Sequence, residues 1–170
     1  MSALPIPQPC NASRQAVQEY AEAVAESVGY TPGTGVESVV AQLGGRLKYL
    51  SLDESRQHEA DGSLVVHGPG DFEISLSAVT GAVRDQFTIA HELGHYFLHS
   101  QGGKQRIRAE RYGSGRVEWE ANWFAAAFLM PSELFTEEAE RNQGDAERIA
   151  TRFFVSSAAA EVRLKSLGLR

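Results

Sequence analysis

Apolar residues recur at helical spacing along residues 14–28, with Ser13 before them and Gly29 after them. Ser favours the position that caps a helix N-terminus and Gly favours its end, so the pattern predicts a first helix. A short second helix is predicted over residues 36–43. The pattern then changes to short apolar or alternating segments near residues 47–52, 64–66 and 72–76, the last two joined by a Gly- and Pro-rich turn. These segments predict a small three-stranded sheet, mostly antiparallel.

The second half of the chain is predicted to be mainly helical. Helical periodicity covers residues 82–99, and a Gly-, Arg- and Lys-rich loop is expected over residues 101–115. A helix over residues 117–130 is apolar almost all round and should be buried, and Pro131 ends it. Three further helices follow, with caps expected at Ser132 or Thr136, at Asp145, and at Ser156 or Ser157. The whole pattern predicts an α+β fold, with the sheet packed on helices.

Length and composition point to one globular domain with flanking segments. The chain has 170 residues, 42% of them hydrophobic, and its longest apolar run is far shorter than a membrane span. Three prolines predict a disordered arm over residues 1–12, followed by the domain over residues 13–140. A helical segment over residues 141–170 is expected to pack on the domain or extend it. No secretory signal is recognisable, so we expect a cytoplasmic protein without a membrane partner.

The charge distribution argues against direct nucleic-acid binding. The formal net charge is −6, and binding to nucleic acid depends on an excess of Lys and Arg. Residues 141–170 carry six cations against three acidic groups, and the segment Lys104–Arg116 is also basic. We interpret both as solvated faces. Cys10, the only cysteine, is expected to be a surface thiol.

The segment His91-Glu92-Leu93-Gly94-His95 carries the chemistry that the sequence predicts most specifically. Residues four apart on a helix share one face, so His91 and His95 can bind one zinc ion through their imidazoles. Glu92 would lie beside the open coordination position, where it can take a proton from water. The expected chemistry is metal-assisted hydrolysis. Gly94, on the apolar side of the helix, allows another element to approach closely.

A catalytic zinc site needs a third protein ligand, and the candidates are His99, Glu118, Glu120 or a residue of the basic loop. His99 lies two turns beyond His91 along the helix, too far for both to bind one ion, so we expect His99 to be buried and hydrogen-bonded. Glu118 is favoured because an unpaired carboxylate in an apolar helix would be costly. Glu120 points to the opposite side of that helix and is expected in solvent. Asn122, one turn after Glu118, could orient a ligating carboxylate or a nearby backbone group.

Two separated motifs resemble the ImmA/IrrE family of metallopeptidases. One is the run RDQFTIAHELGHYFLH over residues 84–99, and the other is EWEANWFAA over residues 118–126, followed by Leu129-Met130-Pro131. The C-terminal segment, around residues 149–156 and 163–169, is also similar to the family. The resemblance implies a compact zincin-like, gluzincin-type domain with zinc held by His91, His95 and Glu118 and with Glu92 as catalytic base. It also implies cleavage of a helix-turn-helix repressor, which would relieve repression of phage, mobile-element or stress genes.

A second class of function stays open from the residues: a zinc-containing regulatory or toxin/antitoxin-type binding module that does not cleave its partner. Glu92 favours the peptidase, since a structural zinc site needs no general base. The C-terminal segment is helix-turn-helix-like, but Phe154 stands in its turn, where such motifs usually prefer Gly. We therefore expect a helical hairpin packed on the core. The sequence predicts no oligomeric state.

Overall fold

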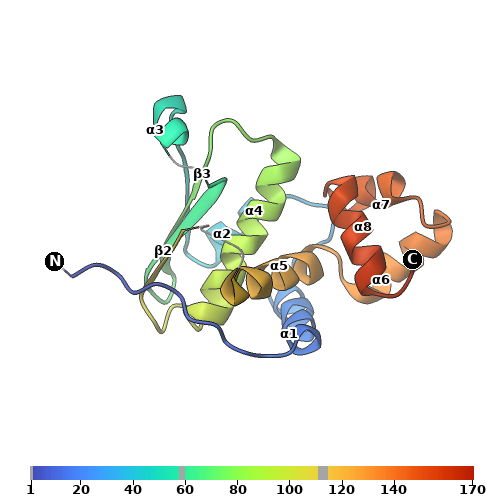
Figure 1. The fold of residues 1–170 in the computed structure, drawn as a ribbon, viewed down its shortest axis with the longest axis horizontal. Coiled ribbons are helices and arrows are strands. Elements are labelled where there is room, and N and C mark those ends of the chain that lie inside the picture. The colour runs from blue at the N-terminus through green and yellow to red at the C-terminus, as the bar shows by residue number, and fades with distance from the viewer. Residues whose placement is uncertain (1, 58–59, 111–114) are drawn as a thin grey trace.

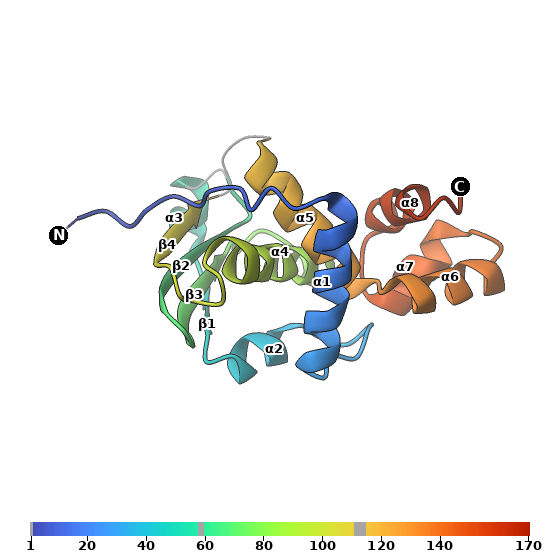
Figure 2. The same ribbon diagram turned by 90° about the horizontal axis from the view of Figure 1, so that it is seen from below.

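The computed structural model describes residues 2–57, 60–110 and 115–170, and it shows a mixed sheet covered by helices (Figure 1). In chain order the elements are α1 (Arg14–Ser27), α2 (Glu37–Gln42), β1 (Arg46–Tyr49), α3 (Leu52–Gln57), β2 (Gly62–Gly68), β3 (Asp71–Leu76), α4 (Ala82–Gly94), the π-helical turn η1 (His95–His99), β4 (Ile107–Glu110), α5 (Arg116–Leu129), α6 (Ser132–Arg141), α7 (Ala146–Phe153) and α8 (Ser157–Ser166). Figure 2 shows the layers in sequence: sheet, α4, the pair α1 and α5, and finally α6 to α8.

The sheet has four strands in the order β1-β3-β2-β4, where three were predicted. β2 pairs antiparallel with both β3 and β4, whereas β1 pairs parallel with β3. The missed strand is β4, which the sequence placed in the basic loop. Ile107 and Ala109 are buried and Arg108 between them is exposed, but so short a run carries little periodic signal. The strand forms because it pairs with β2, and this contact cannot be recognised from the local sequence.

The hydrophobic core lies between the sheet and α4 and continues to α1 and α5. Leu64, Val66, Phe72 and Ile74 point inward from the sheet and are fully buried. Gly94 lies where α4 meets α5: a Cβ built there would be 3.1 Å from Cα of Ala121. The missing side chain therefore sets the distance between the two helices that carry the site, as the sequence predicted.

Three local predictions differ from the structure. Leu52, taken as the end of a strand, begins α3 and is exposed. The α5 helix is less buried than its composition suggests, because the Trp119 side chain is 51% exposed. The α6 helix has Pro131 at its cap, and the side chains of Ser132 and Thr136 do not cap it. The Ser132 main chain and hydroxyl donate instead to Glu22 of α1.

The two flanking segments both contact the body of the protein. Residues 2–13 form no helix or strand, as the prolines predict, yet the Pro5 carbonyl accepts a hydrogen bond from the Arg108 amide on β4. At the other end, the buried Arg163 of α8 donates to the Met130 carbonyl and to Glu22. The boundary proposed at residue 140 stays a prediction. Within the described residues, no helix is both long enough and apolar enough to cross a bilayer.

Candidate metal centre

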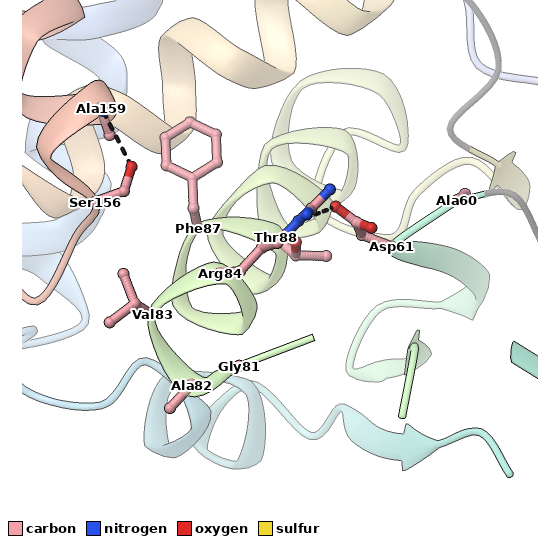
Figure 3. A pocket seen from close by; sticks show the side chains of 10 residues that line it. All are labelled: Ala60, Asp61, Gly81, Ala82, Val83, Arg84, Phe87, Thr88, Ser156 and Ala159. Atoms are coloured by element: carbon pink, nitrogen blue, oxygen red, sulfur yellow. Dashed lines mark hydrogen bonds and ion pairs between the residues drawn. The ribbon is translucent and has the colours of Figure 1, made fainter. Parts of the chain in front are cut away.

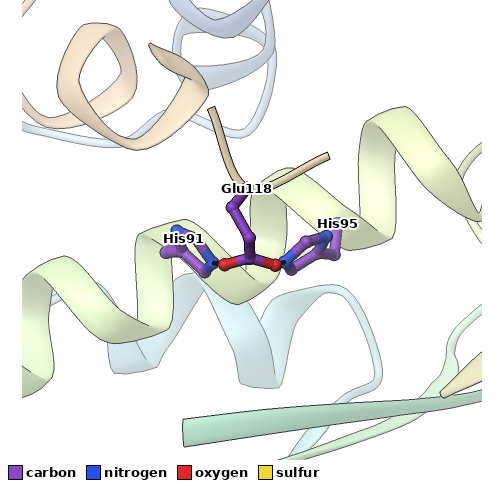
Figure 4. A group of neighbouring side chains, drawn as sticks. All are labelled: His91, His95 and Glu118. Atoms are coloured by element: carbon purple, nitrogen blue, oxygen red, sulfur yellow. Dashed lines mark hydrogen bonds and ion pairs between the residues drawn. The ribbon is translucent and has the colours of Figure 1, made fainter. Parts of the chain in front are cut away.

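His91, His95 and Glu118 converge on one point between α4 and α5 (Figure 4). His91 lies in the last turn of α4, His95 opens η1, and Glu118 lies in the first turn of α5. The His91 Nε2 is 3.0 Å from one carboxylate oxygen of Glu118, and the His95 Nε2 is 3.2 Å from the other. The two Nε2 atoms are 3.1 Å apart. All three side chains are nearly or wholly buried.

The outer hydrogen bond of His91 fixes which of its nitrogens faces the other two groups. His91 Nδ1 lies 2.8 Å from Oδ1 of Asn122. An amide oxygen only accepts, so Nδ1 of a neutral ring carries the hydrogen and Nε2 presents a lone pair. Asn122 therefore orients a histidine; the sequence had assigned it a carboxylate or backbone group. The signal was its position one turn after Glu118, but the partner depends on how α5 crosses α4.

Two further residues, His99 and Glu120, fix the tautomer of His95 in the same way. His99 Nε2 lies 2.8 Å from Oε2 of Glu120, and His99 Nδ1 lies 2.9 Å from Nδ1 of His95. Because a carboxylate accepts, His99 Nε2 carries the hydrogen and its Nδ1 accepts from His95. Burial lowers the pKa of His99, although its bond to Glu120 opposes that shift, and a neutral ring is what this arrangement needs. His95 Nε2 is left with a lone pair.

This donor set fits a divalent metal ion. Two imidazole lone pairs and a carboxylate face one another at 3.0–3.2 Å, an arrangement of acceptors that only a cation or added protons can make favourable. Ligands held tetrahedrally at zinc-like bond lengths lie about 3.3 Å apart. Burial acts to raise the pKa of Glu118, but with protons on the two Nε2 atoms the hydrogen bonds and charge of His91 and His95 outweigh it and hold that pKa well below its usual range. A bound cation would take the place of those protons.

Glu92 lies beside these residues and is 1% exposed. Gly62, the first residue of β2, borders it: a Cβ at Gly62 would be 3.4 Å from Oε1 of Glu92 and 2.5 Å from the Thr88 methyl group. Glycine at this strand end therefore keeps room beside the Glu92 carboxylate. The structure thus brings His91, His95 and Glu118 together, and Glu92 follows His91 in α4. The role of Glu92 as a base stays a prediction.

Glu120 differs from its prediction and is wholly buried. Its carboxylate accepts from His99, from Nε of Arg116 at 2.9 Å, and from the main-chain amides of Cys10 and Asn11, each at 2.9 Å. Burial raises the pKa of Glu120, and these donors more than offset it, bringing the pKa to about 2. Arg116, four residues earlier on the same helix face, was the signal that could have identified a paired carboxylate.

A cavity of about 870 Å³ opens beside the N-terminal half of α4 (Figure 3). Phe87 and Thr88 of α4 line one side, Asp61 and Ala60 a second, and Ser156 and Ala159 of the C-terminal segment a third. Thr88 precedes Glu92 by one helical turn, so the cavity lies next to the candidate site. Of the basic segment Lys104–Arg116, residues 111–114 lie outside the described residues, and β4 forms its centre.

Comparison with known proteins identifies one matching family. A peptidase family model described as the IrrE N-terminal-like domain matches residues 72–165, which include α4, β4 and α5. Metallopeptidase ImmA of Bacillus subtilis (strain 168) is 33% identical over 85 residues, covering 49% of this chain and 50% of that protein. Both matches agree with the resemblance found in the two sequence motifs.

Among solved structures, a Mycobacterium tuberculosis transcriptional regulator has a similar fold. Its TM-score is 0.63 with 18% sequence identity, and the match covers 89% of this chain and 46% of that one. At that identity the likeness concerns the fold alone. The chain spans about half the length of each of these two proteins.

Proposed function

Because this chain belongs to the peptidase family described as the IrrE N-terminal-like domain, we propose that it is a zinc-dependent endopeptidase. His91, His95 and Glu118 would hold the ion and Glu92 would act as general base. The observation that carries the proposal is the convergence of two imidazole lone pairs and a carboxylate within 3.0–3.2 Å, with the buried Glu92 next to His91 in α4.

The chemistry divides between the ion and the protein's own side chains. A bound zinc ion would supply a Lewis acid for the scissile carbonyl and would make water more acidic. Glu92 would take the proton from the attacking water and deliver it to the amine nitrogen that leaves. Asn122 and His99 would hold the rings of His91 and His95 in the tautomers that turn Nε2 inward.

An extended peptide substrate would lie along the outer edge of β4. β4 is an edge strand, and such an edge accepts an additional strand through main-chain hydrogen bonds. The Arg108 amide on this edge is bonded to the Pro5 carbonyl of the arm, so a substrate would have to displace that contact. The groove beside it is lined by Arg108, Glu110 and Glu118, so a peptide there would reach the metal ligands. The cavity in Figure 3 would receive substrate side chains next to Glu92.

For the substrate we propose a helix-turn-helix transcriptional repressor, which the family resemblance implies. Cleavage would relieve repression of the genes that it controls. To test this substrate, the metal-loaded protein is incubated with the repressor encoded beside it, with and without a chelator. The products are then analysed by mass spectrometry. Chelator-sensitive fragments would support the proposal. An intact repressor that nevertheless binds the metal-loaded protein would favour the binding module.

The proposed base is tested by Glu92→Gln. This variant keeps the size of the side chain and removes no ligand, so folding and metal content should match the wild type. Cleavage should fall by about 10²–10⁴-fold because proton transfer is lost. Glu137→Gln, on the exposed face of α6, is the matched control and should cleave at the wild-type rate. Wild-type cleavage by the Glu92 variant would exclude the mechanism.

A further inference from the structure

We propose that Glu120 and His99 are positioning residues for the metal ligand His95, and that the main chain of the N-terminal arm is part of this supporting structure. The inference rests on the proposed function, because it assigns His95 to a metal ion. It goes beyond that function by extending the site to residues 10–12, which lie more than 100 residues before α5 in the sequence.

The first step is the continuous hydrogen-bonded chain from His95 outward. His95 Nδ1 contacts His99 Nδ1 at 2.9 Å, and His99 Nε2 contacts Glu120 at 2.8 Å. His99 is 4% exposed and Glu120 is wholly buried, so water does not compete for these bonds. The π-helical turn η1 places His99 beside His95, with the Ser100 amide bonded to the His95 carbonyl. Such turns recur at functional sites in helices.

The second step is the way in which Glu120 itself is held. Each of its two oxygens accepts two hydrogen bonds: Oε1 from Asn11 N and Arg116 Nε, Oε2 from Cys10 N and His99 Nε2. Four donors from three separate segments leave this carboxylate little freedom to rotate. The direction in which it accepts from His99 is therefore fixed, and the ring of His95 is fixed in turn.

The third step concerns the arm. Asn11 has a left-handed backbone, with φ of 58°, a conformation that Asn tolerates and that can turn successive amides towards one anion. Arg116 also connects the arm to Glu120, because it donates both to the Glu120 carboxylate and to the Ala12 carbonyl. The arm is thus attached to the metal centre through its main chain, and the side chain of Cys10 stays exposed.

Metal affinity tests the proposal independently of cleavage. We would compare wild type with His99→Phe, Glu120→Gln and Cys10→Pro, measuring metal dissociation constants by chelator competition and the absorption spectrum of the cobalt-loaded protein. His99→Phe and Glu120→Gln should weaken metal binding by about 10–100-fold and alter the cobalt spectrum. Cys10→Pro removes one amide donor and should weaken it several-fold. Gln8→Ala, at an exposed position of the arm, leaves the four donors to Glu120 in place and should bind metal like the wild type.

The free energy of unfolding of the metal-free variants separates positioning from stability. Wild-type metal affinity and cobalt spectrum in Glu120→Gln and Cys10→Pro would overturn the proposal, even if both variants were less stable. Glu120→Gln is nearly isosteric and Cys10→Pro lies outside the core, so the test stands if His99→Phe does not fold. A wild type that binds metal but cleaves nothing would contradict the proposed function while the affinities still decide this inference. A wild type that takes up no metal would overturn both.

Discussion

At the scale of single residues, the site depends on which hydrogen bonds lie behind the ligands. His91 and His95 are four residues apart, and this spacing alone predicts that they share a face. The structure adds that each ring has a different outer partner, Asn122 for His91 and His99 for His95. Ligands and outer partners should therefore differ in how much their loss weakens metal binding.

We predict that Glu118→Ala loses metal binding almost completely, because a bound ion would keep only two protein ligands and the buried carboxylate would be gone. Asn122→Ala leaves all three ligands in place and removes only the acceptor for His91 Nδ1. Its affinity should fall by about 10–100-fold. Zinc titration in the presence of a chelator measures both values. Equal losses in the two variants would show that Glu118 is not a ligand.

Sequence reasoning placed Glu118 with the two histidines, where the structure has it, but misplaced Glu120, and the reason is physical. Helix geometry shows that the two residues point in opposite directions, yet it does not show what lies on each side. Glu120 faces His99, Arg116 and the N-terminal arm. The arm was predicted to be disordered, and a segment without periodicity gives no indication of a tertiary contact. Glu120→Ala should therefore affect the site instead of being neutral.

At the scale of elements, the long helices were predictable and the shortest strand was not. α4 and α5 extend over several turns, so their periodic patterns are strong. β4 has four residues, and the parallel pairing of β1 with β3 joins segments that are separated by α3 and β2. Non-local pairings of this kind are decided by packing, which no local pattern records. The position of β4 matters because it forms the edge beside the metal centre.

Gly94 determines how closely α4 and α5 pack, and therefore how the site residues on these two helices are placed. A Cβ at this position would be 3.1 Å from both Cα and O of Ala121, which are main-chain atoms and cannot rotate away. Gly94→Ala should lower the free energy of unfolding by about 1–3 kcal/mol through overpacking, despite the better helix propensity of Ala. It should also weaken metal binding, because α5 carries Glu118.

Chemical denaturation and metal titration of the Gly94 variant measure these two effects. Gly68→Ala is the control, since a Cβ at Gly68 meets nothing within 4 Å. The control should stay within about 0.5 kcal/mol of the wild type. A Gly94 variant with wild-type stability and affinity would mean that α4 and α5 can separate without disturbing the site.

At the scale of the whole molecule, the two flanking segments are attached at opposite sides of α5. Figure 2 shows the N-terminal arm crossing towards the sheet and α8 lying beyond α1 and α5. Arg163 fastens the C-terminal segment to the Met130 carbonyl and to Glu22. The arm has two separate attachments, one to Glu120 through residues 10 and 11 and one to β4 through Pro5.

These two attachments of the arm should have opposite effects on activity. Residues 10 and 11 support the metal site through Glu120, whereas Pro5 bonds to the β4 edge that an extended substrate would use. Leu4, Ile6 and Pro7 line the same groove as Glu118. The arm would therefore compete with a peptide for this groove, while its residues 10 and 11 support the metal ligand His95 through Glu120.

Two deletions separate these effects. Removing residues 2–8 should lower KM several-fold for a peptide substrate and leave metal affinity unchanged, because the amides of Cys10 and Asn11 are retained. Removing residues 2–12 should also expose β4, but it takes away two donors to Glu120 and should weaken metal binding. Steady-state kinetics at saturating zinc, together with zinc titration, distinguish the two. An unchanged KM after the shorter deletion would show that peptide binding does not require the β4 edge to which Pro5 is bonded.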